Sequence, residues 1–148
     1  MQTIISIISL IISLIAIALS YYLFRKTRRA NIMPVLVFSR ISEKSWQLKN
    51  VGRGPALSIV VGERKKNDKW IPRVSFYPIA AGAAIEIPWF CQGDEFAATY
   101  ADIEGKAYST FCSMSDNRFF GKNRFPDLKP MLDEISWKAH QEEYRRMF

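Results

Sequence analysis

The sequence predicts a mainly β protein that is held to a membrane by one N-terminal helix. Three observations predict this class: an uncharged apolar run near the N-terminus, a middle region of short apolar runs separated by turn residues, and helical spacing of apolar residues near the C-terminus. They divide the 148 residues into an anchor with a basic flank (1–29), a β domain (30–125) and a C-terminal amphipathic helix (126–148).

The N-terminal apolar run is long enough to cross a bilayer. Residues 4–24 carry no charged side chain and consist mostly of Ile, Leu, Ala, Ser, Tyr and Phe. At about 1.5 Å per residue, a helix of this length extends roughly 31 Å, close to the ~30 Å hydrocarbon thickness of a bilayer. We therefore expect a single-pass transmembrane helix whose partner is the lipid bilayer.

Charge on the two flanks predicts the orientation of this helix. Three uncharged residues precede the run, and a basic cluster follows it: Arg25, Lys26, Arg28 and Arg29. Short flanks rich in Lys and Arg stay in the cytoplasm, so we expect the N-terminus outside, the β domain in the cytoplasm and the cluster at the lipid headgroups of the inner membrane. The alternative is a signal peptide cleaved after Ala16-Ile17-Ala18, but signal peptides carry positive charge before the apolar region.

Small side chains form one stripe along the predicted helix. They recur at steps of three and four residues: Ser6, Ser9, Ser13, Ala16 and Ser20. Such stripes let membrane helices approach closely, and serine hydroxyls hydrogen-bond across the contact. The stripe predicts a homo-oligomer or docking on the helix of a protein partner. The alternative is that each serine bonds the backbone of its own helix.

The positive net charge of +7 is concentrated beside the apolar run. The basic cluster supplies four of the 21 basic residues, and the other 17 stand against 14 acidic ones, a net charge of +3. The excess is therefore mainly a signal for orientation and for anionic lipid. We expect no nucleic-acid partner.

Seven short runs in the middle of the chain read as β-strands. They are rich in β-branched and aromatic residues, several alternate, and they cover residues 35–40, 45–50, 56–61, 70–76, 84–89, 95–101 and 106–113. Because no helical pattern separates them, they predict an immunoglobulin-like antiparallel β-sandwich of about seven strands. A small barrel is the alternative, since periodicity does not distinguish a closed sheet from two packed sheets.

Turn residues between the runs predict two hairpins and an edge strand. Residues 63–69 are polar and basic, as expected of a hairpin tip. Residues 102–106 contain Gly105, which can adopt the positive φ of a tight turn. Pro72 lacks a backbone donor, so its strand is expected at a sheet edge.

Apolar residues at helical spacing end the chain: Leu128, Met131, Leu132, Ile135 and Ala139. Acidic residues come early in this segment and basic residues come late, which suits the helix dipole. Asp127 is the expected N-cap of this helix.

Exposed basic residues in loops are the candidates for ligand binding: Arg53, Arg64, Lys65 and Lys66. Gly52 and Gly54 flank Arg53, so their amides form either an anion-binding nest or a turn that reverses the chain. No helix start follows them, which favours the turn.

The sequence contains no recognisable catalytic or metal motif. Cys91 and Cys112 are expected to be reduced, small and buried. His140 has no neighbouring ligand, and Asp102 with Glu104 falls short of a calcium site. We therefore expect a non-catalytic protein with no cofactor and no metal.

Three turn-rich stretches, residues 50–56, 78–82 and 100–108, resemble many small bacterial and phage-borne proteins that carry one membrane helix and an immunoglobulin-like domain. The resemblance covers roughly residues 45–110. It implies the anchor and the fold, and it implies no reaction.

These expectations lead to two hypotheses of function. The first is a membrane-anchored binding or assembly module that acts at the cytoplasmic membrane surface and recruits a protein partner. The second is a ligand-gated membrane effector, in which a nucleotide-like anion bound by the β domain causes the transmembrane helices to cluster.

Overall fold

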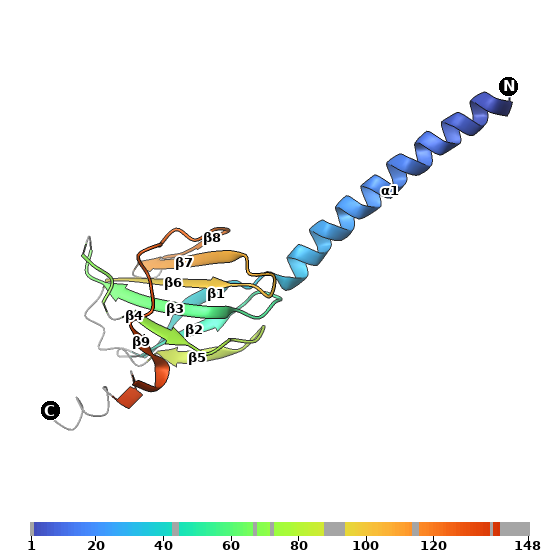
Figure 1. Ribbon diagram of the computed structural model, residues 1–148. Coiled ribbons are helices and arrows are strands. Elements are labelled where there is room, and N and C mark those ends of the chain that lie inside the picture. Colours follow the sequence, from blue (N-terminus) through green and yellow to red (C-terminus); the bar gives the residue numbers. More distant parts are fainter. Residues whose placement is uncertain are drawn as a thin grey trace. The chain divides into compact units, whose positions relative to one another are not determined.

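A computed structural model describes residues 2–42, 45–66, 68–71, 73–87, 94–113, 116–136 and 138–139. The chain forms two compact units, Met1–Asn31 and Ile32–Phe148, and each is considered by itself. The first is a helix and the second is a β domain (Figure 1).

Helix α1 (Gln2–Ile32) contains the whole predicted apolar run and continues through the basic cluster. None of its residues is buried against other parts of the protein, and it is long and apolar enough to span a membrane. The hydroxyls of Ser6 and Ser13 donate to the carbonyls of Gln2 and Ser9, one turn back. These two serines therefore satisfy their hydroxyls within the helix, as in the second interpretation of the stripe.

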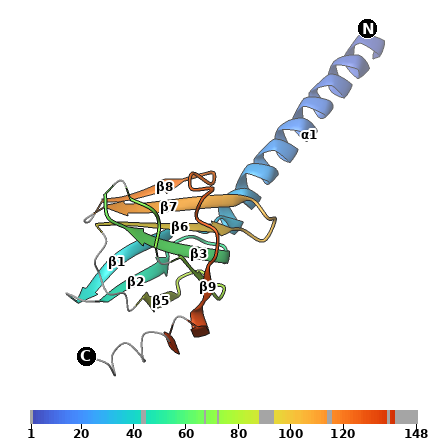
Figure 2. The same ribbon diagram turned by 60° about the vertical axis from the view of Figure 1, so that its left-hand side comes forward.

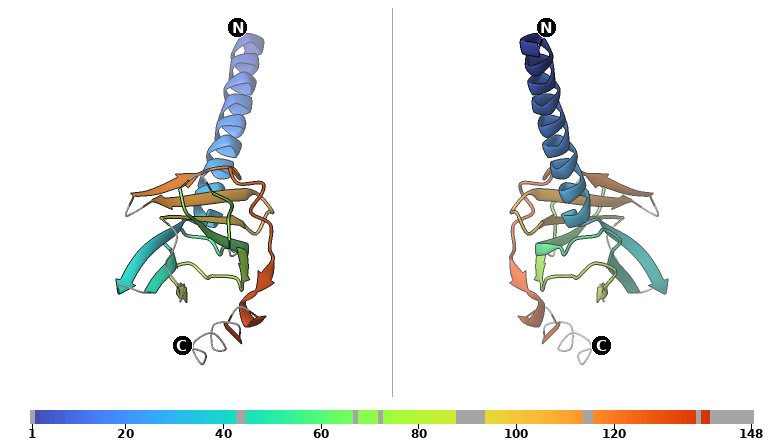
Figure 3. Two further views of the ribbon diagram at one scale, coloured as in Figure 1. Left: turned by 90° about the vertical axis from the view of Figure 1, so that its left-hand side faces the viewer. Right: turned by 90° about the vertical axis from the view of Figure 1, so that its right-hand side faces the viewer.

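The β domain consists of two sheets that face each other (Figures 2 and 3). The three-stranded sheet has the order β1-β2-β5, and the six-stranded sheet has the order β8-β7-β6-β3-β4-β9. The strands are β1 (Leu36–Ser42), β2 (Ser45–Asn50), β3 (Leu57–Arg64), β4 (Arg73–Phe76), β5 (Ala84–Ile87), β6 (Glu95–Ala101), β7 (Ala107–Ser113), β8 (Asp116–Phe120) and β9 (Leu132–Asp133).

This arrangement confirms the predicted mainly β class with an N-terminal apolar helix. All seven predicted strands are present within a few residues of their expected bounds, and two strands, β8 and β9, were not predicted. Two separate sheets favour the sandwich over the small barrel. Pairing is antiparallel except between β4 and β9, which pair in parallel through Val74 and Ser75.

The main core fills the space between the two sheets. Its largest fully buried side chains come from both sheets, including Phe38, Leu48, Ile59 and Val61. A smaller cluster covers the outer face of the six-stranded sheet, where Trp70 and Leu128 lie with Val60 and Ala97. The segment after β8 therefore folds back over this outer face.

The C-terminal segment differs from the expected helix over residues 126–148. Residues 126–133 are not helical: Leu128 is buried in the outer cluster, the Met131 amide donates to the Arg73 carbonyl, and Leu132–Asp133 pair with β4. Helical residues begin at Glu134, and the Asp133 carboxylate accepts from the Ser136 amide at 2.6 Å. Asp133 is thus the N-cap, and Asp127 is not. Residues 137 and 140–148 lie outside the described part of the chain.

The edge-strand prediction is only partly correct. Pro72 itself lies outside the described residues, but β4 has β3 on one side and the two-residue β9 on the other. The strand therefore lies next to the edge of its sheet. β9 covers it over Val74 and Ser75.

Side chains of the large sheet close the free edge of β1. The Leu36 amide donates to the Tyr100 hydroxyl, and the Leu36 carbonyl accepts from the Thr110 hydroxyl. The Asn117 side chain accepts from the Phe38 amide at 2.9 Å and donates to the Phe38 carbonyl at 2.8 Å. The amide of Asn117 thus takes the place of a neighbouring strand along this part of β1.

Asn50 joins the first residues of the domain to two loops. It is fully buried, and its Oδ1 accepts from the Val35 and Gly52 amides at 3.2 and 3.0 Å. Its Nδ2 donates to the Gly54 and Ile79 carbonyls at 2.8 and 3.1 Å. One side chain therefore holds together three segments that are distant in the sequence.

Glycine is required beside this junction because the backbones approach closely. A Cβ atom at Gly52 would overlap the backbone of residues 33–35, and one at Gly54 would overlap that of Ile32. The stretch 50–56 is therefore a turn that packs on the start of the domain, as the second interpretation of these glycines predicted.

The predicted hairpin at residues 102–106 is confirmed. Gly105 has φ of +78°, as a tight turn requires. The carboxylate of Asp102, which is 3% exposed, accepts from the Glu104 and Lys106 amides and from the Tyr108 hydroxyl. Its oxygens are thus engaged by donors of the protein.

Asn50→Ala should lower the free energy of unfolding by about 3 kcal/mol, because it leaves several buried backbone groups without a partner. Guanidinium unfolding of the full chain in detergent micelles, followed by tryptophan fluorescence, measures the change. Asn123→Ala removes one exposed side-chain bond to the Phe125 amide and is the matched control. Equal losses in the two variants would contradict the central role of Asn50.

Candidate functional site

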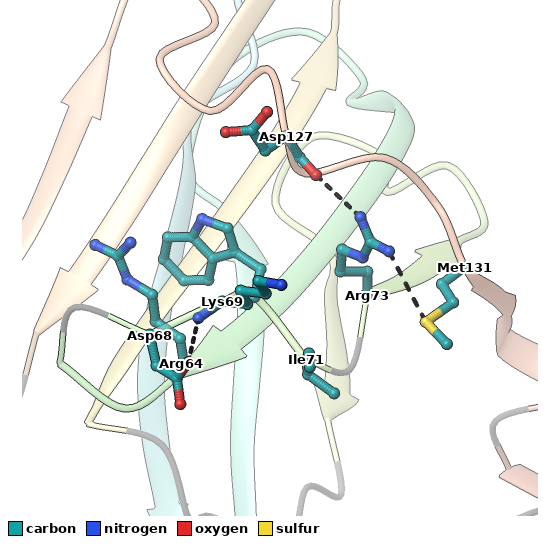
Figure 4. A pocket seen from close by; sticks show the side chains of 8 residues that line it. Arg64, Asp68, Lys69, Ile71, Arg73, Asp127 and Met131 are labelled. Atoms are coloured by element: carbon teal, nitrogen blue, oxygen red, sulfur yellow. Dashed lines mark hydrogen bonds between the residues drawn. The ribbon is translucent and has the colours of Figure 1, made fainter.

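A pocket of about 490 Å³ lies on the outer face of the large sheet (Figure 4). Its lining comes from the end of β3, the β3–β4 connection, the start of β4 and the segment after β8. The lining residues are Arg64, Asp68, Lys69, Trp70, Ile71, Arg73, Asp127 and Met131.

Trp70 and Arg64 form one wall of the pocket. Trp70 is only 8% exposed and meets Phe125 edge to face, with ring centroids 5.5 Å apart. The Arg64 guanidinium lies 4.2 Å from the Trp70 ring centroid, and its Nε donates to Glu95 Oε2 at 2.7 Å. The charge of Arg64 is therefore balanced by a carboxylate, and its plane is fixed by the indole.

Arg73 forms the opposite wall and has no carboxylate partner in the described part of the chain. Its guanidinium donates to the Asp127 carbonyl at 3.1 Å and contacts Met131 Sδ at 4.0 Å, while Nε is buried without a partner. Figure 4 shows the Asp127 carboxylate turned away from this guanidinium. The positive charge of Arg73 is thus held in place by neutral groups.

The lining combines positive charge with exposed apolar surface. Lys69 adds a second cation, and Ile71 and Met131 are each 62% exposed. Lining residues include no Ser, Cys or His, and the described residues contain no group of three or more His, Cys, Asp or Glu that could hold a metal ion. Asp68 and Asp127 also line the pocket, so its lining carries charges of both signs beside the exposed apolar side chains.

The structure separates the predicted ligand-binding residues. Arg64 lines the pocket, and Lys65 and Lys66 follow it in an exposed loop without lining it. Arg53 lies beyond the other end of β3, and Leu57 to Arg64 alone extends roughly 23 Å at 3.3 Å per residue. Arg53 and the 64–66 cluster thus do not form one site.

The amides that flank Arg53 are occupied. The Gly52 amide donates to Asn50 Oδ1, and the Arg53 and Gly54 amides donate to the Met33 carbonyl at 3.2 and 3.4 Å. Because an anion-binding nest needs free N–H groups, this turn does not provide one.

The remaining candidates lie on α1 or in the core. The stripe from Ser6 to Ser20 and the basic residues Arg25, Lys26, Arg28 and Arg29 are all exposed. Cys112 is fully buried, and burial with the nearby Asp116 charge raises the pKa of its thiol to about 11, so it is a neutral core residue. Cys91 and His140 lie outside the described residues.

Sequence reasoning missed Arg73, Lys69 and Trp70 as parts of one pocket. Arg73 alternates with the buried Val74, which places its side chain on the outer face. That the segment around Asp127 and Met131 covers this face follows only from tertiary structure.

Comparisons with protein-family models, curated proteins and solved structures found no match.

Glu63 is a buried acid beside the pocket but on the other face of β3. It pairs in register with Phe96 of the core and is 7% exposed, and its Oε2 has no hydrogen-bond partner among the residues that the structure describes. Burial in this apolar setting raises the pKa of Glu63 from 4.5 to about 7.

Glu63→Gln should reduce the dependence of stability on pH. A raised pKa means that the folded state binds more protons than the unfolded state between pH 4.5 and 7, so the free energy of unfolding falls across this range and levels off above it. The fall should be about 1–3 kcal/mol smaller in the variant. Unfolding at pH 5 and pH 8 measures it, with the exposed Glu86→Gln as control. An unchanged pH dependence would contradict the burial of Glu63.

Proposed function

We propose that this protein is a single-pass, non-catalytic binding and assembly module of the inner membrane, with an immunoglobulin-like sandwich at the cytoplasmic surface. The observation that carries the proposal is α1, in which no residue is buried by the rest of the chain. A free apolar helix of this length needs lipid or another helix around it. The β domain then acts as a module that the helix concentrates at the membrane.

Charge and aromatic residues at the end of the apolar run support the orientation. Arg25, Lys26, Arg28 and Arg29 follow the run directly, as expected for a cytoplasmic flank. The Arg25 guanidinium lies 5.0 Å from the Tyr21 ring centroid, a pairing that suits the headgroup boundary. The partner is a protein or a second copy of the chain, reached through the helix stripe or through the β domain.

The orientation predicts which side of the membrane protects the β domain. Protease added to intact cells should leave the domain whole, and protease added to inverted vesicles should remove it. The opposite pattern would contradict the cytoplasmic placement. A mature N-terminus at Leu19 would show instead that the chain is cleaved after Ala18 as a signal peptide.

Replacing Ser9 and Ser13 together with Leu should weaken association between helices without impairing insertion. Leucine is more hydrophobic than serine, but its bulk prevents the close backbone approach that the stripe allows. Ile8→Leu with Ile12→Leu changes another face and is the matched control. Crosslinking in membranes measures both pairs. If the stripe variant associates as well as the control, the serine hydroxyls make hydrogen bonds only within their own helix.

The pocket favours a second candidate function, the ligand-gated effector. Its supporting observation is Arg73, a partly buried cation whose partners in the pocket are a carbonyl and a thioether. An anionic ligand would supply the missing negative charge, with Lys69 as a second contact. Nucleotides combine anionic phosphate with an aromatic base, whose faces would pack on apolar side chains such as Ile71 and Met131.

Arg73→Gln should abolish any stabilisation of the full chain by a nucleotide. A ligand at 100 times its dissociation constant stabilises the folded state by about 2.7 kcal/mol. Thermal unfolding in detergent with nucleotides, cyclic nucleotides and inorganic phosphate measures this effect. Arg118→Gln removes an exposed cation paired with Asp116 and is the control. No shift of the wild-type protein with any of these probes would leave the assembly module as the only candidate.

A further inference from the structure

The most exposed large apolar side chains of the β domain lie at one edge of the large sheet. In the described part of the domain, four of them are 62–65% exposed and no other exceeds 55%: Ile71, Tyr77, Met131 and Ile135. Two of the four flank β4 and the other two flank β9, and these are the last two strands of the sheet. Exposed apolar surface is therefore concentrated at the β4–β9 edge.

Three of these side chains lie on the outer face of the sheet with Arg73. β4 alternates between core and outer positions, and Arg73 and, directly after the strand, Tyr77 have outer positions. On β9, Leu132 packs on the core, so the preceding Met131 lies on the outer face. Ile71 and Met131 line the pocket together with Arg73 (Figure 4). We call Ile71, Arg73, Tyr77 and Met131 the Arg73 surface.

Arg73 has no carboxylate partner among the residues that the structure describes. Its guanidinium reaches the Asp127 carbonyl and Met131 Sδ, and its Nε is buried without a partner. The Asp127 carboxylate is turned away from it (Figure 4), and the Asp68 carboxylate accepts from the Lys69 amide. A guanidinium that neutral groups hold in place can still bind a carboxylate from another molecule.

Charge and length indicate what kind of molecule fits this surface. The pocket lining has three basic and two acidic side chains, a net charge of +1: Arg64, Lys69, Arg73, Asp68 and Asp127. One carboxylate balances this excess, whereas the phosphates of a nucleotide bring more negative charge. Ile71 and Tyr77 are six positions apart, which is roughly 20 Å of extended chain. That length suits a peptide segment better than a small ligand.

We propose that the Arg73 surface docks a segment of a protein partner that presents one carboxylate between large apolar side chains. The carboxylate bonds to Arg73, one apolar side chain enters the pocket beside Ile71 and Met131, and another packs on Tyr77. Arg, Tyr and Met are residue types that interfaces between proteins favour. The inference rests on the proposed assembly function, because it identifies where the β domain recruits its partner.

Selection from a displayed library of random peptides on the full chain in detergent tests the docking. We expect the selected peptides to share an Asp or Glu beside large apolar residues. Fluorescence polarisation then measures the dissociation constant of one selected peptide. Exchanging its acid for the amide should weaken binding to the wild type about tenfold, as expected for a hydrogen bond to a charged group. The same exchange should leave binding to Arg73→Gln unchanged.

Tyr77→Ala separates a docked peptide from a small ligand, because Tyr77 does not line the pocket. It should weaken binding of the selected peptide about fivefold. The matched control is Ile41→Ala, which shortens an apolar side chain that is 54% exposed on β1 of the other sheet. This control should bind the peptide as the wild type does.

Selected peptides without an acid, or equal binding of the acid and amide forms, would overturn the docking. A selection without binders would overturn it too, and stabilisation of the wild type by a nucleotide would then assign the pocket to a small ligand. Binding that requires deletion of residues 140–148 would identify that segment as the occupant instead of a partner. None of these measurements depends on lipid, so the protease and crosslinking experiments test the proposed anchoring separately.

Discussion

The buried amide of Asn50 is the interaction on which the arrangement of the β domain depends. Its four bonds reach Val35 just before β1, the turn at Gly52 and Gly54, and the loop at Ile79. A side-chain amide has donors and an acceptor on one rigid plane, so it can satisfy several backbone groups at once. The same bonds position the turn that carries Val51. The start of the domain, this turn and the loop at Ile79 are therefore held together by one side chain.

Local pattern was sufficient to predict most of the fold. Alternation along β2 and β6, and a glycine suited to the turn at Gly105, were visible in the sequence, and the strands and hairpin are where they were expected. β8 was missed because its residues are mostly exposed and it is defined by pairing with β7. The terminal helix was predicted to start too early. Leu128 packs instead on the outer face of the large sheet, a contact that helical periodicity does not reveal.

The candidate pocket was less predictable than the fold. Arg64 was singled out as a loop cation, yet it stacks on Trp70 and pairs with Glu95, so its charge is already balanced. Arg73 carries the unbalanced charge, and its sequence neighbourhood looks like an ordinary strand. Its partners come from residues more than fifty positions away. Counting the charged residues of each loop therefore indicates which end of a domain is basic. It does not indicate which cation lacks a carboxylate partner in the folded domain.

With the membrane anchoring proposed above, the closed edge of β1 bears on how closely copies of the domain can be packed on a surface. An open strand edge offers the same row of donors and acceptors to any neighbour, and chains confined to a surface meet often. Here Asn117 occupies the backbone groups of Phe38 on this edge, and Tyr100 and Thr110 occupy those of Leu36. Random strand exchange between neighbouring domains is thereby suppressed along β1. The local concentration of the domain can therefore rise without β-aggregation that starts from this edge.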